Sequence, residues 1–177
     1  MTVGSSTRAV QHVPSLGDRV PVVPVVGSIN VDRIARVRAF PGPGETVITG
    51  AFRETLDGKG ANQAAAAARA GATARMAGRV GADAAAERIM GLLADVGVDT
   101  SLVRTAAGEQ SGIAHITIDG TGENQIVVIP GANGAMTPDD VAALAAELSA
   151  ADLVVCQGEL PAETVEAACR TPHGRFR

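Results

Sequence analysis

The chain contains no tryptophan and no tyrosine, and aromatic residues make up only 2% of its 177 residues. Because nucleic-acid bases stack on aromatic rings, this scarcity argues against a single-strand or base-binding protein. The formal net charge is −4, whereas a nucleic-acid-binding surface is normally basic. Hydrophobic residues reach 46%, yet no apolar run has the length of a membrane span. The composition therefore predicts a globular protein with neither a nucleic-acid nor a membrane partner.

An apolar signal-peptide block is also missing from the start of the sequence. Residues 1–20 carry scattered polar and charged side chains, so we expect them to form a disordered tail. The two cysteines, Cys156 and Cys169, fall in an expected strand and an expected helix and lack the spacing of metal ligands. Together these features predict a cytoplasmic protein in a reducing compartment, without a metal site.

Strand and helix signals alternate along the chain. Short β-branched runs are followed by alanine- or leucine-rich segments with helix caps, such as Asp83 before one helix and Pro138 at the first position of another. The pattern predicts strands at 22–26, 34–39, 46–56, 73–80, 112–118, 125–129 and 153–156, and helices at 61–70, 83–96, 137–148 and from Pro161 onward. Such an order predicts an α/β protein with a mostly parallel sheet flanked by helices. The hairpin-like pairs predict a smaller β sheet at one edge.

The segment from Asp57 to Gln63 joins a predicted strand to an alanine-rich helix. Gly58 and Gly60 have no Cβ, so the backbone can approach a neighbour closely, and the N–H groups of the helix start can face the same point. Lys59 adds a cationic donor, and Asn62 adds an amide that both donates and accepts. These groups suit a small polyhydroxylated ligand. The alternative is a glycine-rich turn with a surface lysine.

Two further polar clusters follow predicted strands. Asn30 and Asp32 are two residues apart, so they point to the same side in extended backbone and could bind adjacent hydroxyls. Glu159 follows the strand at 153–156 and could orient another hydroxyl. Each carboxylate has a simpler alternative, because Asp32 could cap a turn and Glu159 could stabilise a helix start. Open α/β sheets place ligands at strand ends, which favours a shared site.

Four motifs resemble those of the PfkB family of sugar kinases, and within it the ribokinase-like members. They are Val26-Gly27-Ser28-Ile29-Asn30-Val31-Asp32, Pro43-Gly44-Glu45-Thr46, Gly58-Lys59-Gly60-Ala61-Asn62-Gln63 and Gly131-Ala132-Asn133-Gly134-Ala135. Their order and spacing match the family from about residue 22 to residue 169. The combination is specific, although each motif alone is weak.

The resemblance implies ATP-dependent phosphorylation of the primary hydroxyl of a pentose, D-ribose, with Mg²⁺ and a monovalent cation as the family's other requirements. Residues matching the family's sugar site would hold the substrate: Asn30, Asp32, Gly58, Lys59, Asn62 and Glu159. The strands at 34–39 and 46–56 would belong to a β lid that closes over the site and excludes water. In the family this lid often mediates dimers, which implies a homodimer.

Two departures from the family are visible. Asp57 stands where the family has a small residue, usually glycine, so a positive φ there would be strained and the charge would need compensation. The family's Gly-Ala-Gly-Asp motif, with its general base and anion hole, the nucleotide pocket and the cation loop lie downstream of the matched region. No Gly-x-x-x-x-Gly-Lys-Ser/Thr phosphate loop replaces them.

We therefore expect residues 21–170 to be the N-terminal portion of a ribokinase-like domain, followed by an aberrant tail at 171–177. This portion would retain most of the sugar site and contain no catalytic residue, so the chain alone would be inactive. Two alternatives are a non-catalytic sugar-binding module and one half of a split kinase. A fructose or nucleoside specificity is a third, and the scarce aromatics disfavour a nucleoside.

Overall fold

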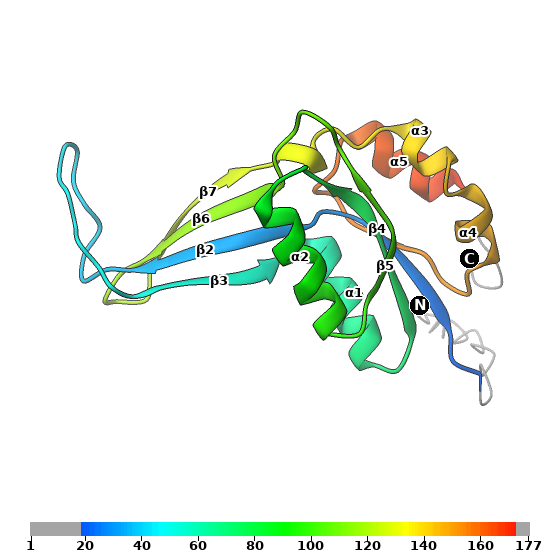
Figure 1. Ribbon diagram of the computed structural model, residues 1–177, viewed down its shortest axis with the longest axis horizontal. Helices are drawn as coiled ribbons and strands as arrows, with labels where there is room; N and C mark the ends of the chain where they lie inside the picture. Colours follow the sequence, from blue (N-terminus) through cyan, green and yellow to red (C-terminus); the bar gives the residue numbers. More distant parts are fainter. Residues whose placement is uncertain (1–18, 173–177) are drawn as a thin grey trace, which may run out of the picture.

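The computed structural model describes residues 19–172 and shows two parts, a helix-flanked body and a long curved β sheet that extends from it (Figure 1). The predicted tails fall almost entirely on residues 1–18 and 173–177, which lie outside the described residues. The strands are β1 (Val22–Val26), β2 (Asn30–Arg36), β3 (Phe52–Asp57), β4 (Thr73–Val80), β5 (Asp99–Thr105), β6 (Gly112–Ile118), β7 (Asn124–Ile129) and β8 (Val155–Cys156). The helices are α1 (Lys59–Arg69), α2 (Ala84–Asp95), the 3-10 turn η1 (Gly131–Asn133), α3 (Pro138–Ala142), α4 (Ala145–Ala150) and α5 (Ala162–Arg170).

The body contains a four-stranded parallel sheet in the order β5-β4-β1-β8. Helices α1 and α2 cover one face and α3, α4 and α5 cover the other (Figure 1). Successive side chains of a strand point to opposite faces, so β1 contributes Val25 to the core under α1 and α2 and Val26 to the core under the other helices. This arrangement confirms the predicted α/β fold with a mostly parallel sheet.

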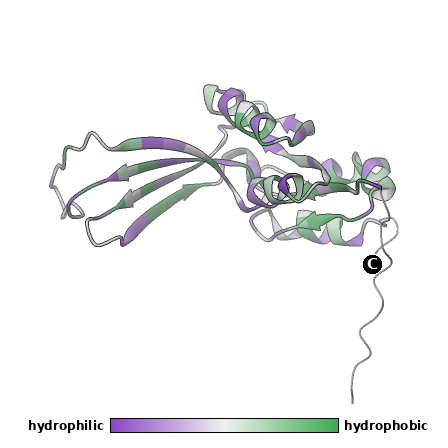
Figure 2. Cartoon of the chain, turned by 90° about the horizontal axis from the view of Figure 1, so that it is seen from below, coloured by the Kyte–Doolittle hydropathy of each residue, from purple (hydrophilic) through white to green (hydrophobic). Residues whose placement is uncertain are grey.

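The second sheet, in the order β3-β2-β6-β7, is the smaller β sheet predicted at one edge. We call it the lid, and its closure over the site stays a prediction. The pairs β2–β3 and β6–β7 are antiparallel, as expected for hairpins, and β2–β6 is parallel. Polar and apolar stretches are interspersed along the strands of this sheet (Figure 2), and β7 ends in four consecutive apolar residues. Arg88 of α2 joins the body to the lid through an ion pair with Glu54 of β3, with Nε and Oε2 3.3 Å apart.

Several predicted boundaries are wrong. The first lid strand begins at Asn30 and not at residue 34, which places Asn30 and Asp32 inside a strand. Residues 46–51 form no strand: β3 begins at Phe52, where its ladder with β2 ends at the pair Ala35–Phe52. The helix predicted at 137–148 is two short helices, α3 and α4, and the strand predicted at 153–156 is reduced to two residues.

Strand β5 has no counterpart among the predicted elements. Its sequence is mostly polar, and only Leu102 is buried. Because β5 is the edge strand of the body sheet, one anchored side chain and pairing with β4 are enough to hold it. Within residues 19–172, none of the helices has the length and apolarity needed to cross a membrane.

Candidate functional site

The three polar segments predicted from the sequence meet where the lid joins the body. Ser28, in the turn between β1 and β2, donates a hydrogen bond from its hydroxyl to Oε2 of Glu159 at 2.7 Å. The ammonium of Lys59, at the start of α1, lies 3.0 Å from Oε1 of the same carboxylate. Gln157 donates to the Ser28 hydroxyl at 3.3 Å. The structure therefore brings Lys59 and Glu159 into direct contact and adds Ser28 and Gln157, to which the sequence analysis assigned no role.

Glu159 is held in its charged form. Burial by itself would raise its pKa, but the Ser28 hydroxyl and the Lys59 ammonium outweigh burial and lower the pKa of Glu159. The same hydrogen bond and ion pair with Glu159 raise the pKa of Lys59. The two groups therefore carry opposite full charges at neutral pH, and a ligand that enters this site meets an ion pair that is already formed.

The glycines at the helix start serve the protein's own packing. Gly58 has φ +94°, and a Cβ there would lie 2.7 Å from the carbonyl oxygen of Ser28. A Cβ on Gly60 would lie 2.6 Å from the carbonyl carbon of Gly27. The close approach predicted for a ligand is therefore made by the turn between β1 and β2.

The N–H groups predicted to be free at the same helix start also have partners. The N–H of Lys59 donates to Oε2 of Glu159 at 3.2 Å, and the N–H of Gly60 reaches the Ser28 hydroxyl at 3.5 Å. The N–H of Ala61 donates to the carbonyl of Ser28 at 3.0 Å. This correction matters chemically, because a hydroxyl or anion would have to displace Glu159 and Ser28 to reach the helix start.

Asn30 is fixed by a second asparagine that sequence reasoning had placed in a motif without a role. Asn133 of η1 is 2% exposed and donates to Oδ1 of Asn30 at 2.8 Å. It also accepts from the N–H of Ile29 at 2.9 Å and donates to the Ile29 carbonyl at 3.1 Å. A Cβ at residue 112 would lie 2.1 Å from Oδ1 of Asn30, so Gly112 makes room for this pair.

Asp32 is the most unusual group in the site. It is 7% exposed, and its Oδ1 atom is buried without a hydrogen-bond partner. Burial, then the charge of Asp57 and a side-chain hydrogen bond with it, and last the charge of Glu159, raise the pKa of Asp32 from 3.8 to about 6. A buried carboxylate acceptor without a partner is costly, and a ligand hydroxyl would satisfy it.

Asp57, the departure from the family pattern, lies at the end of β3 opposite Asn30. Within residues 19–172, positive φ is confined to glycines, so Asp57 is free of the left-handed strain considered above. Its carboxylate accepts a hydrogen bond from the Asn62 amide. Asn62 is exposed on α1 and is therefore held towards Asp57 at the rim of the site.

A pocket of about 170 Å³ lies between these segments. Its lining residues are Ser28, Asn30, Val128, Pro130, Asn133 and Glu159. Ligand pockets for drug-sized molecules are larger, roughly 300–1,000 Å³. This volume, with amide, hydroxyl and carboxylate groups in its wall, suits a small polar molecule.

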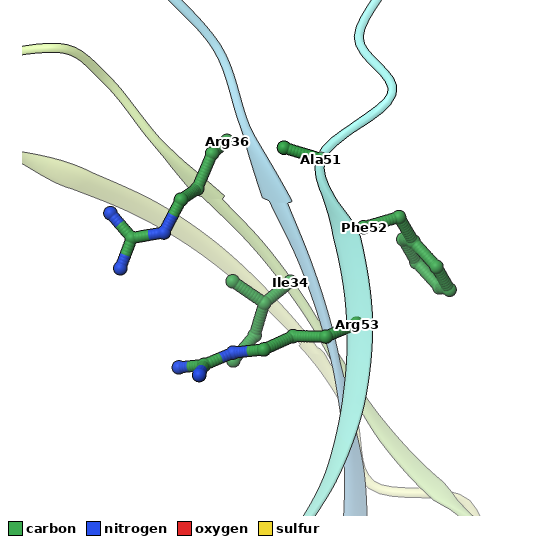
Figure 3. A pocket seen from close by; sticks show the side chains of 5 residues that line it. All are labelled: Ile34, Arg36, Ala51, Phe52 and Arg53. Carbon is green, nitrogen blue, oxygen red and sulfur yellow. The ribbon is translucent and has the colours of Figure 1, made fainter.

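A second pocket, of about 150 Å³, lies on the lid. It is formed by Ile34, Arg36, Ala51, Phe52 and Arg53, and the two arginine side chains extend past Ile34 on one side of the sheet while Phe52 points the other way (Figure 3). It contains no hydroxyl, amide or carboxylate side chain. Of these two pockets, only the first has hydroxyl, amide and carboxylate side chains in its wall.

Two observations on the described residues concern metal and nucleotide binding. Between residues 19 and 172, no cluster of three or more histidine, cysteine, aspartate or glutamate side chains could hold a metal ion. Side chains already accept from backbone N–H groups at the starts of three helices: Glu159 at α1, Asp83 at α2 and Thr137 at α3. The carboxylates of Glu159 and Asp83 oppose a polyphosphate at the starts of α1 and α2. We therefore assign no reaction step to a nucleotide or a metal in this part of the molecule.

Comparison with known proteins identifies the class. The model of the pfkB family carbohydrate kinases matches residues 21–173, so the chain belongs to this family. It is 39% identical over 149 residues to a ribokinase of Bacillus subtilis, covering 84% of this chain and 50% of that protein. It is 36% identical over 143 residues to a deoxyribokinase of Salmonella typhi, covering 81% of this chain and 47% of that protein.

The fold is shared with solved ribokinases. One is a ribokinase of Arabidopsis thaliana complexed with ribose and ATP, which matches with a TM-score of 0.69 and 30% identity. The match covers 85% of this chain and 50% of that structure. The chain thus spans about half the length of the relatives it matches.

Proposed function

We propose that this chain forms the sugar-binding portion of a ribokinase-type kinase, whose reaction is phosphorylation of the primary hydroxyl of D-ribose by ATP. The observation that supports it most is the small pocket that Asn30 and Glu159 line, with the buried, unpartnered Oδ1 of Asp32 two residues from Asn30 on the same strand. Membership of the pfkB family supports carbohydrate as the ligand class. The proposed contacts to the sugar come from Asn30, Asp32, Gly58, Lys59, Asn62 and Glu159.

The proposed roles follow from the chemistry of each side chain. Asp32, with a free buried acceptor, takes hydroxyl hydrogens of the sugar, and Asn30 offers an amide already oriented by Asn133. Lys59 and Glu159 form a charged pair at the rim, which can donate to and accept from a further hydroxyl. A sugar hydroxyl that bonds a charged group contributes more than one that bonds a neutral group.

Phosphoryl transfer is proposed to need groups outside residues 19–172. ATP, Mg²⁺ and a monovalent cation belong to the family's reaction, and the described residues hold no cluster of three or more histidine, cysteine, aspartate or glutamate side chains for a metal ion. On this view the chain alone binds the sugar without phosphorylating it, whether it acts as a sugar-binding module or is completed by a second chain. The proposed location is the cytoplasm, where ATP is available.

We also propose that the lid forms a homodimer. Its strand β7 exposes three consecutive apolar residues, with Val127 64% exposed. An edge strand with a run of exposed apolar side chains tends to pair with another chain. Sedimentation velocity measures the oligomeric state and therefore tests this proposal directly.

Isothermal titration calorimetry with D-ribose and with 2-deoxy-D-ribose tests the sugar site. We expect saturable binding of at least one of the two pentoses, and weaker or no binding of D-fructose. The same preparation, incubated with MgATP, should yield no pentose phosphate above background. If the chain is folded, as judged by circular dichroism, but binds neither pentose, the proposed sugar site is wrong. If the chain phosphorylates a pentose at an ordinary kinase rate, the assignment of catalysis to groups outside this chain is wrong.

A further inference from the structure

The two cysteines of the chain lie side by side although 13 positions separate them. Cys156 ends β8, and Cys169 is the last residue but one of α5. Their sulfur atoms are 3.3 Å apart, and both residues are free thiols. Because the chain has only two cysteines, no other thiol of the same molecule competes for either of them.

The two thiols differ in accessibility. Cys169 is exposed, whereas Cys156 is half-buried among the apolar residues under α5. Burial and the neighbouring sulfur of Cys169 raise the pKa of the Cys156 thiol to about 11. The exposed thiol therefore meets an oxidant first, and the half-buried thiol is positioned to react with it afterwards.

The segment between the cysteines carries the third polar cluster. Glu159 lies within it and binds both Ser28 and Lys59. Gln157, directly after Cys156, accepts a hydrogen bond from the N–H of Glu159. A bond between the two sulfurs would close a loop around residues 157–168 and restrict the position of Glu159.

We propose that Cys156 and Cys169 form an intramolecular disulfide when the protein meets a peroxide, and that this bond restrains the segment that carries Glu159. In the first step the Cys169 thiolate attacks one peroxide oxygen, the O–O bond breaks, and the released hydroxide takes a proton to become water. Cys169 is then a sulfenic acid. In the second step the Cys156 sulfur attacks the Cys169 sulfur, the S–O bond breaks, and hydroxide leaves with the thiol proton as water. Two thiols are oxidised and one peroxide is reduced to two waters.

The movement that the bond requires is small. A disulfide has a sulfur–sulfur distance of about 2.05 Å, so the two atoms must approach by roughly 1.2 Å. The backbone of Cys156 is held by pairing with Val26 of β1. Cys169 lies in the last turn of α5, where a helix end can shift more easily than its middle. The adjustment therefore falls on the end of α5.

Peroxide treatment of the purified chain, followed by thiol counting and intact mass, tests the bond. We expect loss of both thiols, a mass lower by two hydrogen atoms, a monomer on a non-reducing gel, and full reversal by dithiothreitol. No lysine or arginine lies between residue 104 and residue 170, so trypsin leaves both cysteines on one peptide. Cleavage after Glu159, Glu163 and Glu166 separates them and shows the link directly.

The single variants report the order of the two steps. In Cys156→Ser we expect Cys169 to persist as a sulfenic acid that dimedone traps, and in Cys169→Ser we expect the remaining thiol to react far more slowly. Links that form only between molecules, or both thiols surviving a peroxide excess that oxidises Cys156→Ser, would overturn the proposal.

Hydrogen exchange measures the effect on the Glu159 segment without any sugar. In the oxidised wild type, amides of residues 157–161 should exchange several-fold more slowly than in the reduced protein, and peroxide should leave them unchanged in Cys169→Ser. Equal exchange in the oxidised and reduced wild type would refute the restraint on Glu159. Neither readout involves ribose, so a failure here is distinguishable from a failure of the proposed sugar site.

Discussion

Replacement of Asp32 by asparagine should stabilise the protein and weaken the proposed sugar binding at the same time. The fold raises the pKa of Asp32 from 3.8 to about 6, so it disfavours the charged form. A change of one pKa unit corresponds to about 1.4 kcal/mol, so the raised pKa corresponds to a loss of up to about 3 kcal/mol once the group is fully ionised. The neutral amide of Asp32→Asn removes that loss.

The sign of the pH dependence follows from the same values. Below about pH 4 the carboxyl is protonated in both the folded and the unfolded chain, so Asp32 costs nothing there. Between pH 4 and about 6 the unfolded chain ionises first, and wild-type stability falls as pH rises. Above about pH 6 the full loss is present. Asp32→Asn should therefore match the wild type in acid and exceed it at neutral pH.

Urea denaturation followed by circular dichroism measures both proteins across this range. Asp139→Asn is the matched control, because Asp139 is exposed and the same change there should give no such pH-dependent gain. Calorimetry should show pentose affinity lower by at least about tenfold in Asp32→Asn, since a hydrogen bond to a charged group contributes about 1.5–3 kcal/mol. A variant that is no more stable than the wild type at neutral pH, or whose gain is the same in acid, would refute the reasoning.

Two further predictions concern the helix start and the lid. Gly58→Ala should lower the free energy of unfolding by more than about 2 kcal/mol, because it combines a positive φ with contact to the Ser28 carbonyl. Gly71 has φ +91° and open space where an added Cβ would lie, so Gly71→Ala should cost only about 1 kcal/mol in the same urea titration. Equal losses in the two variants would exclude the contact with the Ser28 carbonyl as the cause. In sedimentation velocity the wild type should be a dimer and Val127→Lys a monomer, while the body variant Leu153→Lys, which replaces another exposed apolar residue, stays dimeric. A monomeric wild type would contradict the dimer proposal.

The body of the fold was predictable because its signals are local. Asp83 caps α2 in the structure as the sequence predicts, with its side chain accepting from the N–H of Ala86. The β-branched run of β1 and the alanine-rich sequence of α1 have strong intrinsic preferences for strand and helix. Contacts with the rest of the chain therefore hardly alter their secondary structure. The edge strand β5 was missed because pairing with β4 holds it, and pairing leaves little trace in a polar sequence.

The candidate site was predictable in its residues and less so in its contacts. Lys59 and Glu159 were both named from motifs, and the resemblance to sugar kinases gave them a common ligand. That they bind each other, and that Glu159 occupies the helix start, depends on a contact across 100 residues of sequence. Asn133 was visible in a motif, but its bonds to Ile29 and Asn30 appear only when η1 packs beside β6.

Residue types and their spacing were thus enough to establish the α/β class and the family, and to propose polar groups for one site. Local chemistry determines these features, because caps, glycines and strand-forming runs act within a few residues of themselves. The tertiary structure decided which of those groups remain available to a ligand. The protein's own backbone packs against Gly58 and Gly60, and Lys59 forms an ion pair with Glu159. Asp32 keeps a buried oxygen without a hydrogen-bond partner. Burial and distant charge set that difference, and neither is a property of a short stretch of sequence.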